Sequence, residues 1–183
     1  MVYVFLADGF EDLEAIAPID ILKRAKFDVK TVGVSVKNVQ SCMGTKLEAD
    51  ISIDEILFEN LENLELIVLP GGSPGAENLG ANTKVCDIIK HCVTHKILIG
   101  AICAAPVILG KLNFLENIEA CCFPGCEKYL KNAKLSEDYV CNDNKIITAR
   151  GPGVANEFAF ELVAELKGKK DVQKIRKFMQ FSG

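Results

Sequence analysis

Short, uniformly apolar runs separate longer segments in which apolar residues recur every three or four positions. A short apolar run predicts a strand buried on both faces of a sheet, whereas the longer period predicts an amphipathic helix. The expected strands cover residues 2–7, 28–34, 65–69 and 97–102, and a further strand follows a tight turn and ends at Ala149.

Helical patterns follow most of these strands. We expect helices over residues 11–25, 83–95, from Ala104 onward, and 154–168, with a short, solvated amphipathic helix over 169–181. Residues 42–53 predict a hairpin or an excursion, and residues 69–80 a glycine-rich loop. The alternation of strands and helices predicts an α/β fold, a doubly wound sandwich whose mostly parallel sheet has helices on both faces. Because repeats and linkers are lacking, we expect a single domain over residues 1–183.

Four loops with unusual sequences leave the carboxyl ends of predicted strands, which is where open α/β sheets bind ligands. They read DGFEDLE after the first strand, PGGSPG after Leu69, GAICAAP around Cys103 and RGPG after Ala149. Since the carboxyl ends of parallel strands lie along one edge of a sheet, we expect the four loops to converge on one site.

Charge and composition narrow the class of partner. A formal charge of −4 and a pI of about 5.3 give no general attraction to nucleic acid or to an anionic membrane. The first apolar run has six residues, is followed at once by acids and lacks a basic region before it, so it does not predict a signal peptide. We therefore expect a cytoplasmic protein with reduced thiols at its eight cysteines, which are residues 42, 86, 92, 103, 121, 122, 126 and 141.

Cys103 is the candidate nucleophile. A buried cysteine is usually an inert small hydrophobe, and any one of eight is more often structural than reactive. The position of Cys103 between a strand and a helix places its sulfur near unpaired N–H groups, which favour the thiolate. Ala101, Ala104 and Ala105 leave room for a substrate to approach.

Glu14 is the candidate acid–base partner. The acidic residues 11, 12 and 14 near a helix start are ordinarily explained by the helix dipole, and for Glu11 and Asp12 that explanation is sufficient. Glu14 differs because it lies in the apolar stretch LEAIAPID, where burial would raise the pKa of its carboxyl. The backbone N–H groups of Gly71 and Gly72 are candidates for an oxyanion pocket, although an ordinary tight turn or a weak phosphate cradle explains the same glycines.

No metal or cofactor is expected. The segment CCFPGC, residues 121–126, has no second paired cluster and no nearby histidine, unlike structural zinc sites. His91 and His95 are four residues apart on a predicted helix, and we expect both on or near its surface.

The set ADGFEDLEAIAPID, VLPGGSPGAENL, GAICAAP and ARGPG resembles the DJ-1/ThiJ/PfpI superfamily over essentially the whole chain. It is most similar to the branch of the Parkinsonism-associated deglycase and its ThiJ-like and YajL-like relatives. The resemblance implies a flavodoxin-like sandwich, a homodimer and an oxidation-sensitive cysteine at the strand-to-helix corner. It assigns Cys103 as nucleophile and Glu14 as its protonated partner. It also implies a backbone anion pocket at Gly71, Gly72 and Ala104, with Phe123, Arg150, Gly151 and Pro152 at the pocket periphery.

Two positions depart from the superfamily's patterns. The protease-like branches place a histidine directly after the cysteine, whereas this chain has Ala104, which argues against peptidase activity. The deglycase branch often has a histidine where this chain has Phe123. Glu14 would therefore perform most of the acid–base work.

These residues suggest a cysteine-dependent glyoxalase or deglycase. Its substrates would be small carbonyl compounds such as methylglyoxal, or glycated amines and thiols, and it would react through a Cys103 hemithioacetal with Glu14 as proton shuttle. One alternative is an oxidative-stress sensor or chaperone that uses Cys103 oxidation. A lesser alternative, which comes from the ThiJ name, is a role in the metabolism of a thiamine precursor (thiazole).

Overall fold

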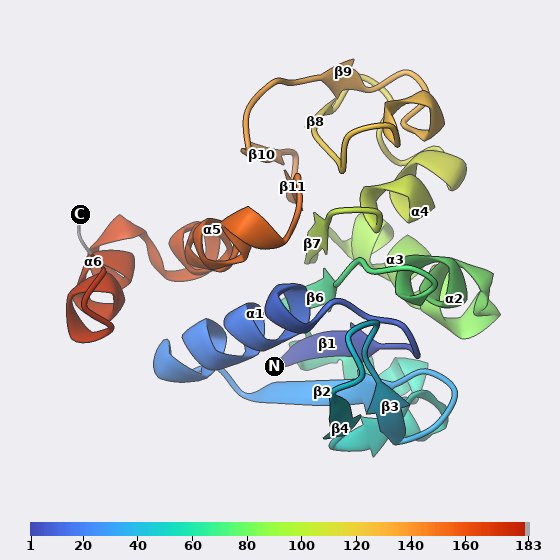
Figure 1. Cartoon of the computed structure of the whole chain (residues 1–183), viewed down its shortest axis with the longest axis horizontal. Helices are drawn as coiled ribbons and strands as arrows, with labels where there is room; N and C mark the ends of the chain where they lie inside the picture. Colours follow the sequence, from blue (N-terminus) through green and yellow to red (C-terminus); the bar gives the residue numbers. More distant parts are fainter. Residues whose placement is uncertain (182–183) are drawn as a thin grey trace.

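The computed structural model describes residues 1–181 and contains a seven-stranded sheet in the order β10-β11-β7-β6-β1-β2-β5 (Figure 1). Six of these strands are parallel, and β10 pairs antiparallel with β11 at one edge. This arrangement confirms the predicted flavodoxin-like α/β fold. The strands are β1 (Val2–Leu6), β2 (Val29–Gly33), β5 (Ile51–Ser52), β6 (Leu66–Leu69), β7 (Leu98–Ile102), β10 (Val140–Asp143) and β11 (Ile146–Ala149).

Helices cover both faces of the sheet, as the apolar strands require. Successive residues of β1 point to opposite faces, so that Val2, Val4 and Leu6 enter one core and Tyr3 and Phe5 the other. The first core is closed by α1 (Asp12–Arg24), α5 (Ala155–Lys167) and α6 (Lys169–Phe178). The second core is closed by α2 (Gly75–Ala81), α3 (Thr83–His95) and α4 (Pro106–Lys111), which gather on the other side in Figure 1.

Helix ends follow the local sequence. The side chain of Glu11 accepts a hydrogen bond from the N–H of Glu14 at 2.8 Å and so caps α1. Asn82 caps α3 in the same way, accepting from the N–H of Val85 at 3.1 Å. The predicted end of α5 at Gly168 is confirmed, since Gly168 takes a φ of 88° that favours glycine.

Gly100 in β7 explains how α5 packs so closely on the sheet. A Cβ atom at this position would lie 2.8 Å from a methyl group of Leu162 and 2.9 Å from the ring of Phe158. Only glycine leaves room for this contact without a shift of the helix.

The structure corrects the sequence interpretation in three segments. The glycine-rich loop is shorter than expected, because helix α2 begins at Gly75 within it. The helix after Cys103 begins at Pro106, since Ala104 and Ala105 form a turn. Residues 38–52 form a two-stranded antiparallel sheet of β3 (Asn38–Gln40) and β4 (Lys46–Glu48), followed by the edge strand β5.

Residues 113–139, for which the pattern predicts no element, carry a second small sheet of β8 (Glu119–Ala120) and β9 (Lys134–Leu135). Short 3₁₀ turns complete the chain: η1 (Ile53–Glu55), η2 (Phe58–Asn63), η3 (Glu127–Tyr129) and η4 (Pro152–Val154). Over residues 1–181, none of the helices has both the length and the apolar character needed to cross a membrane.

Candidate active site

The four predicted loops meet at the carboxyl edge of the sheet. In the central strand order β2-β1-β6-β7-β11, the chain adds β2 on one side of β1 and then adds β6, β7 and β11 on the other side. Doubly wound sheets bind ligands at such a switch point, here between β1 and β6. The loops after β1 and β6 are joined there, because the N–H of Glu11 donates to the carbonyl of Gly71 at 3.3 Å. The corner after β7 is joined to the end of β11 by the Cys103 N–H, which donates to the Ala149 carbonyl at 2.8 Å.

Cys103 occupies a strained corner. Its φ is 65°, in the left-handed region that residues other than glycine rarely adopt. Two backbone hydrogen bonds hold it there, one to Ala149 and one in which the N–H of Phe123 donates to the Cys103 carbonyl at 2.8 Å. The side chain is only 9% exposed. The sulfur is therefore fixed at the end of β7 with a small opening to solvent.

Glu14 lies in the first turn of α1 and is fully buried. The N–H of Gly71 donates to its Oε2 at 2.8 Å. Its other oxygen, Oε1, has no hydrogen-bond partner of ordinary geometry within the described part of the chain. Burial raises the pKa of this carboxyl to about 7, against the smaller lowering effects of Cys103 and the Gly71 N–H. The expected rise in pKa is therefore present, and the carboxyl titrates near neutrality.

The side chain of Cys103 is a protonated thiol, whereas its position in the sequence predicted a thiolate. Burial, and after it the neighbouring Glu14 carboxyl, raise the pKa of Cys103 to about 12, although the N–H groups of Gly72 and Ala104 act in the opposite direction. The N–H groups near the helix start act in the predicted direction, but burial and the Glu14 carboxyl outweigh them, so the thiolate is not favoured. At neutral pH the sulfur is protonated and faces a carboxyl that can accept its proton.

Gly71 has a different role from the one expected. Its N–H group is occupied by Glu14 and does not point at a substrate oxygen, whereas the N–H groups of Gly72 and Ala104 do reach the Cys103 sulfur. A Cβ atom at Gly71 would lie 2.7 Å from both the Cys103 Cβ and the Glu14 Oε2. Glycine is required here because thiol and carboxyl both pack against its backbone.

The peripheral residues lie beside this pair. Phe123 is 47% exposed, and its ring covers Gly151, where a Cβ atom would lie 3.4 Å from it. Arg150 lies over the Tyr139 ring, with 5.5 Å between the guanidinium carbon and the ring centroid. Pro152 begins the turn η4 that leads into α5. Of these residues, Phe123 contributes most directly, through its N–H bond to Cys103.

The two histidines lie on α3 and not in the site. His91 is partly exposed and His95 exposed, and their rings stack with centroids 4.0 Å apart. Across residues 1–181, no group of histidine, cysteine and carboxylate side chains is arranged to hold a metal ion. Acid–base work at Cys103 is therefore left to Glu14 in this subunit.

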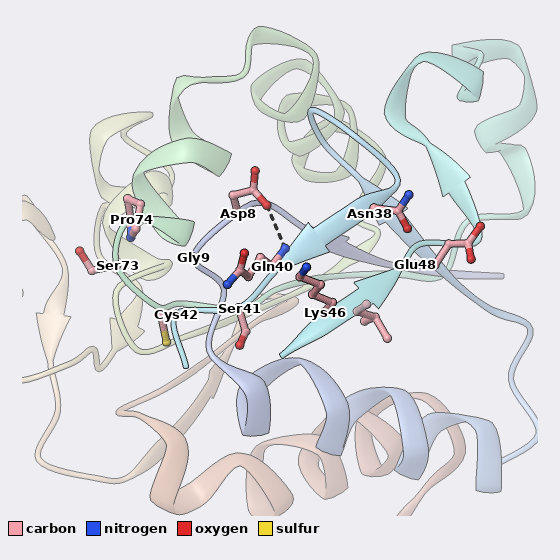
Figure 2. A pocket seen from close by; sticks show the side chains of 11 residues that line it. Asp8, Gly9, Asn38, Gln40, Ser41, Cys42, Lys46, Glu48, Ser73 and Pro74 are labelled. Atoms are coloured by element: carbon pink, nitrogen blue, oxygen red, sulfur yellow. Dashed lines mark hydrogen bonds between the residues drawn. The ribbon is translucent and has the colours of Figure 1, made fainter. Parts of the chain in front are cut away.

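A cavity of about 900 Å³ lies beside the site and not at it. Figure 2 shows this groove between the β3–β4 hairpin and the loop that carries Ser73 and Pro74. Gln40 closes part of it with an N–H that donates to the Asp8 carboxylate at 2.9 Å. Neither Cys103 nor Glu14 lines the groove, so its size carries no argument about the chemistry.

The sequence did not reveal the backbone anchors of the site. Ala149 and Phe123 hold Cys103 through main-chain hydrogen bonds. Such bonds do not depend on the identity of the side chain, so the sequence carries no mark of them. It also gave no pairing for Cys121 and Cys141, which meet although 20 residues separate them in the chain. Contacts of this kind depend on the tertiary fold and leave no periodic signal.

The fold and the site define an α/β protein with a cysteine at a strand-to-helix corner beside a buried carboxyl. The DJ-1/PfpI family matches residues 1–165. Protein dj-1beta of Drosophila melanogaster is 32% identical over 177 residues, which cover 95% of this chain and 93% of that protein. The chain therefore belongs to the DJ-1/PfpI family, which confirms the resemblance found in its motifs.

Two further comparisons agree with membership of the DJ-1/PfpI family. The glutathione-independent glyoxalase DJR-1.2 of Caenorhabditis elegans is 29% identical over 168 residues, covering 91% of this chain and 88% of that protein. The solved structure of Toxoplasma gondii DJ-1, oxidized, has a TM-score of 0.93 and 32% identity, and the match covers 100% of this chain and 98% of that one.

Proposed function

We propose that this protein is a cysteine-dependent glyoxalase that acts on methylglyoxal and, as a deglycase, on early glycation adducts. The observation that carries the proposal is the contact between the Cys103 thiol and a buried Glu14 whose pKa is about 7. A general base that works at neutral pH is most effective when its pKa is near 7, because it can then both accept and return a proton. It must also lie within hydrogen-bonding distance of the group that it deprotonates. A relative named as a glutathione-independent glyoxalase supports the same reaction.

The first step is addition of the thiol to the aldehyde carbon. The Glu14 carboxylate takes the S–H proton as the sulfur bonds to that carbon, and the carbonyl electrons become an alkoxide. Glu14 then returns the proton to the oxygen, which gives a neutral hemithioacetal. The N–H groups of Gly72 and Ala104, which lie against the sulfur, are close enough to bind the developing oxyanion.

The second step moves a proton between two carbons. Glu14 removes the hydrogen from the former aldehyde carbon, giving an enediol, and a proton returned to the neighbouring carbon yields a lactoyl thioester. Water then hydrolyses the thioester, releasing lactate and restoring the Cys103 thiol. Atoms balance as methylglyoxal plus water giving lactate, and no external oxidant or reductant is consumed.

Turnover tests the proposal. Purified protein should consume methylglyoxal and form lactate for many cycles without added glutathione, and Cys103→Ala should abolish this activity. The matched control is Cys86→Ser, which alters a partly exposed cysteine on α3 outside the site and should retain full activity. Consumption that stops at one equivalent per chain would exclude an enzyme.

A second candidate function is oxidation sensing at Cys103. The hydrogen bonds from Gly72 and Ala104 to the sulfur would stabilise a sulfinate, to which neutral Glu14 could donate a further one. Two equivalents of peroxide would give the sulfinic acid and two of water. Mild peroxide should then add two oxygen atoms to Cys103, and equal oxidation of all eight cysteines would exclude this function.

We also propose a homodimer formed through α1. Leu13 and Ile16 are apolar residues of this helix and are 57% and 42% exposed. A second copy of the chain would cover them. Light scattering should give twice the mass of 20.0 kDa for the wild-type protein, and Leu13→Asp should return the monomer mass if this face is the interface.

A further inference from the structure

A second pair of sulfur atoms lies outside the proposed active site. Cys121 follows β8, and Cys141 lies in β10 at the edge of the main sheet. Both side chains are buried, with exposed fractions of 2% and 4%. The proposed reaction at Cys103 uses neither of them.

Hydrogen bonds bring the two thiols together. Cys141 pairs with Thr148 across the β10–β11 hairpin, so both side chains point to the same face. The Cys121 Sγ lies 3.7 Å from the Thr148 hydroxyl and 3.7 Å from the carbonyl oxygen of Tyr139. The Cys121 N–H donates to the same hydroxyl at 3.0 Å. Cys121 and Cys141 therefore both lie against Thr148, close enough for each thiol to shift the pKa of the other.

We propose that Cys121 and Cys141 form an oxidisable dithiol that a hydroperoxide converts into an intrachain disulfide. Two thiols held in contact by β8, β10 and Thr148 need little movement to form an S–S bond, whereas an isolated thiol has no second sulfur to react with. Cys92 is a contrasting case, because it is buried within the core formed with α3 and burial alone raises its pKa to about 12.

The chemistry starts at Cys141. Hydrogen bonds from Cys121, and to a lesser degree from Ser136 and Thr148, lower the pKa of Cys141, whereas the pKa of Cys121 is raised, so Cys141 is the more readily ionised of the two thiols. The Cys141 thiolate attacks one oxygen of hydrogen peroxide, the O–O bond breaks, and a sulfenic acid and hydroxide form; the hydroxide takes up the proton that Cys141 released on ionising and becomes water. The Cys121 sulfur then attacks the sulfenic sulfur, expelling a second water and leaving the disulfide. Two thiols lose two electrons to one hydroperoxide, which is fully reduced.

A cavity reaches one member of the pair, Cys121. A cavity of about 310 Å³ is lined by Cys121 together with Ser136, Cys122 and Arg150. The Arg150 guanidinium is close enough to favour the anionic forms of Cys121 and Cys122. Only one residue separates Cys121 from Phe123, whose N–H donates to the Cys103 carbonyl. The disulfide would therefore tie strand β10 to the segment that supports the reactive cysteine.

Peptide mapping of the oxidised full-length protein tests the proposal. The folded protein is treated with hydrogen peroxide, unfolded, alkylated with iodoacetamide and digested with trypsin. Cleavage after lysine places Cys121, Cys122 and Cys126 in the peptide 112–128 and Cys141 in the peptide 135–145. We expect these peptides to be linked, with fragmentation locating the bond at Cys121, and two of the eight free thiols to be lost.

Variants and a urea control show whether the linked peptides come from the Cys121–Cys141 pair, from oxidation at the active site or from random pairing of thiols. Cys103→Ala should form the linked peptides at the wild-type rate, as should the control Cys86→Ser, whereas Cys141→Ser should form none. Wild-type protein oxidised in urea should link these peptides at least tenfold more slowly, because the contact exists only in the fold. The proposal is overturned if both peptides remain fully alkylated when Cys103 is completely oxidised. It is overturned equally by a bond from Cys141 to Cys122 or Cys126, or by equal rates in urea.

Discussion

Replacing Glu14 with glutamine should change the pH dependence of stability. The carboxyl has a pKa of about 7 in the fold and an ordinary value of 4.5. Each pKa unit corresponds to about 1.4 kcal/mol, so ionising Glu14 in place costs about 3 kcal/mol. Glutamine has nearly the same shape but does not titrate, and it therefore avoids this cost.

The direction in which pH changes the free energy of unfolding follows from how many protons each state binds. Below pH 4.5 the carboxyl is neutral in both the folded and the unfolded chain, and the full stability is present. Between 4.5 and about 7 the unfolded chain binds fewer protons than the folded one, so the free energy of unfolding falls as pH rises. Above about 7 both states are ionised, and the loss is complete.

Urea unfolding at pH 4.5 and pH 8 measures this effect. The free energy of unfolding of wild type minus that of Glu14→Gln should fall by about 3 kcal/mol between the two pH values. Other titrating groups contribute equally to both proteins and cancel in the difference. Glu116→Gln, at an exposed position in the loop after α4, is the matched control and should show almost no change. A difference for Glu14→Gln that is independent of pH would refute the buried, neutral-pH carboxyl.

Three other substitutions test neighbouring features. Gly71→Ala should reduce methylglyoxal turnover at least tenfold and destabilise the fold by about 1–3 kcal/mol, since its Cβ would lie 2.7 Å from Glu14 and Cys103. Steady-state kinetics measures the turnover and urea unfolding the stability. Wild-type values for both would contradict the tight packing. Phe123→His should raise kcat/KM for methylglyoxal by adding an imidazole next to Cys103, and Phe114→His, on the α4–β8 loop, should not. Asn82→Ala should lower the free energy of unfolding by about 1 kcal/mol through loss of the α3 cap, with turnover unchanged.

The pattern of apolar residues was sufficient to predict the central sheet. Strands β1, β6 and β7 are buried on both faces, so their sequences are continuous apolar runs that stand out from the helices around them. The segment after Leu112 was not predicted, because β8 and β9 have two residues each and show no period. Helix α2 was missed because its two glycines and two alanines, in seven residues, resemble a loop in composition.

Position in the chain pointed to Cys103 and the family resemblance to Glu14 as its protonated partner, but the protonation state of the Cys103 thiol was not predicted. The burial of Glu14 follows from its apolar neighbours in the chain, and its raised pKa follows from that burial. The state of the Cys103 thiol depends on how deeply the corner is enclosed by the loops after β1, β6 and β11, which the local sequence does not specify. Contacts between distant segments, such as Cys121 with Cys141, are set by the fold in the same way.

The central claim is that Glu14 serves as the base for Cys103, and the pH profile of methylglyoxal turnover tests it most directly. Because the reactive form requires the Glu14 carboxylate, kcat/KM should rise with pH, reach half its plateau near pH 7 and be about tenfold below the plateau at pH 6. Glu14→Gln should lose this rise together with most of the activity. A wild-type profile that is flat from pH 6 to 8, or an unchanged profile in Glu14→Gln, would contradict the account.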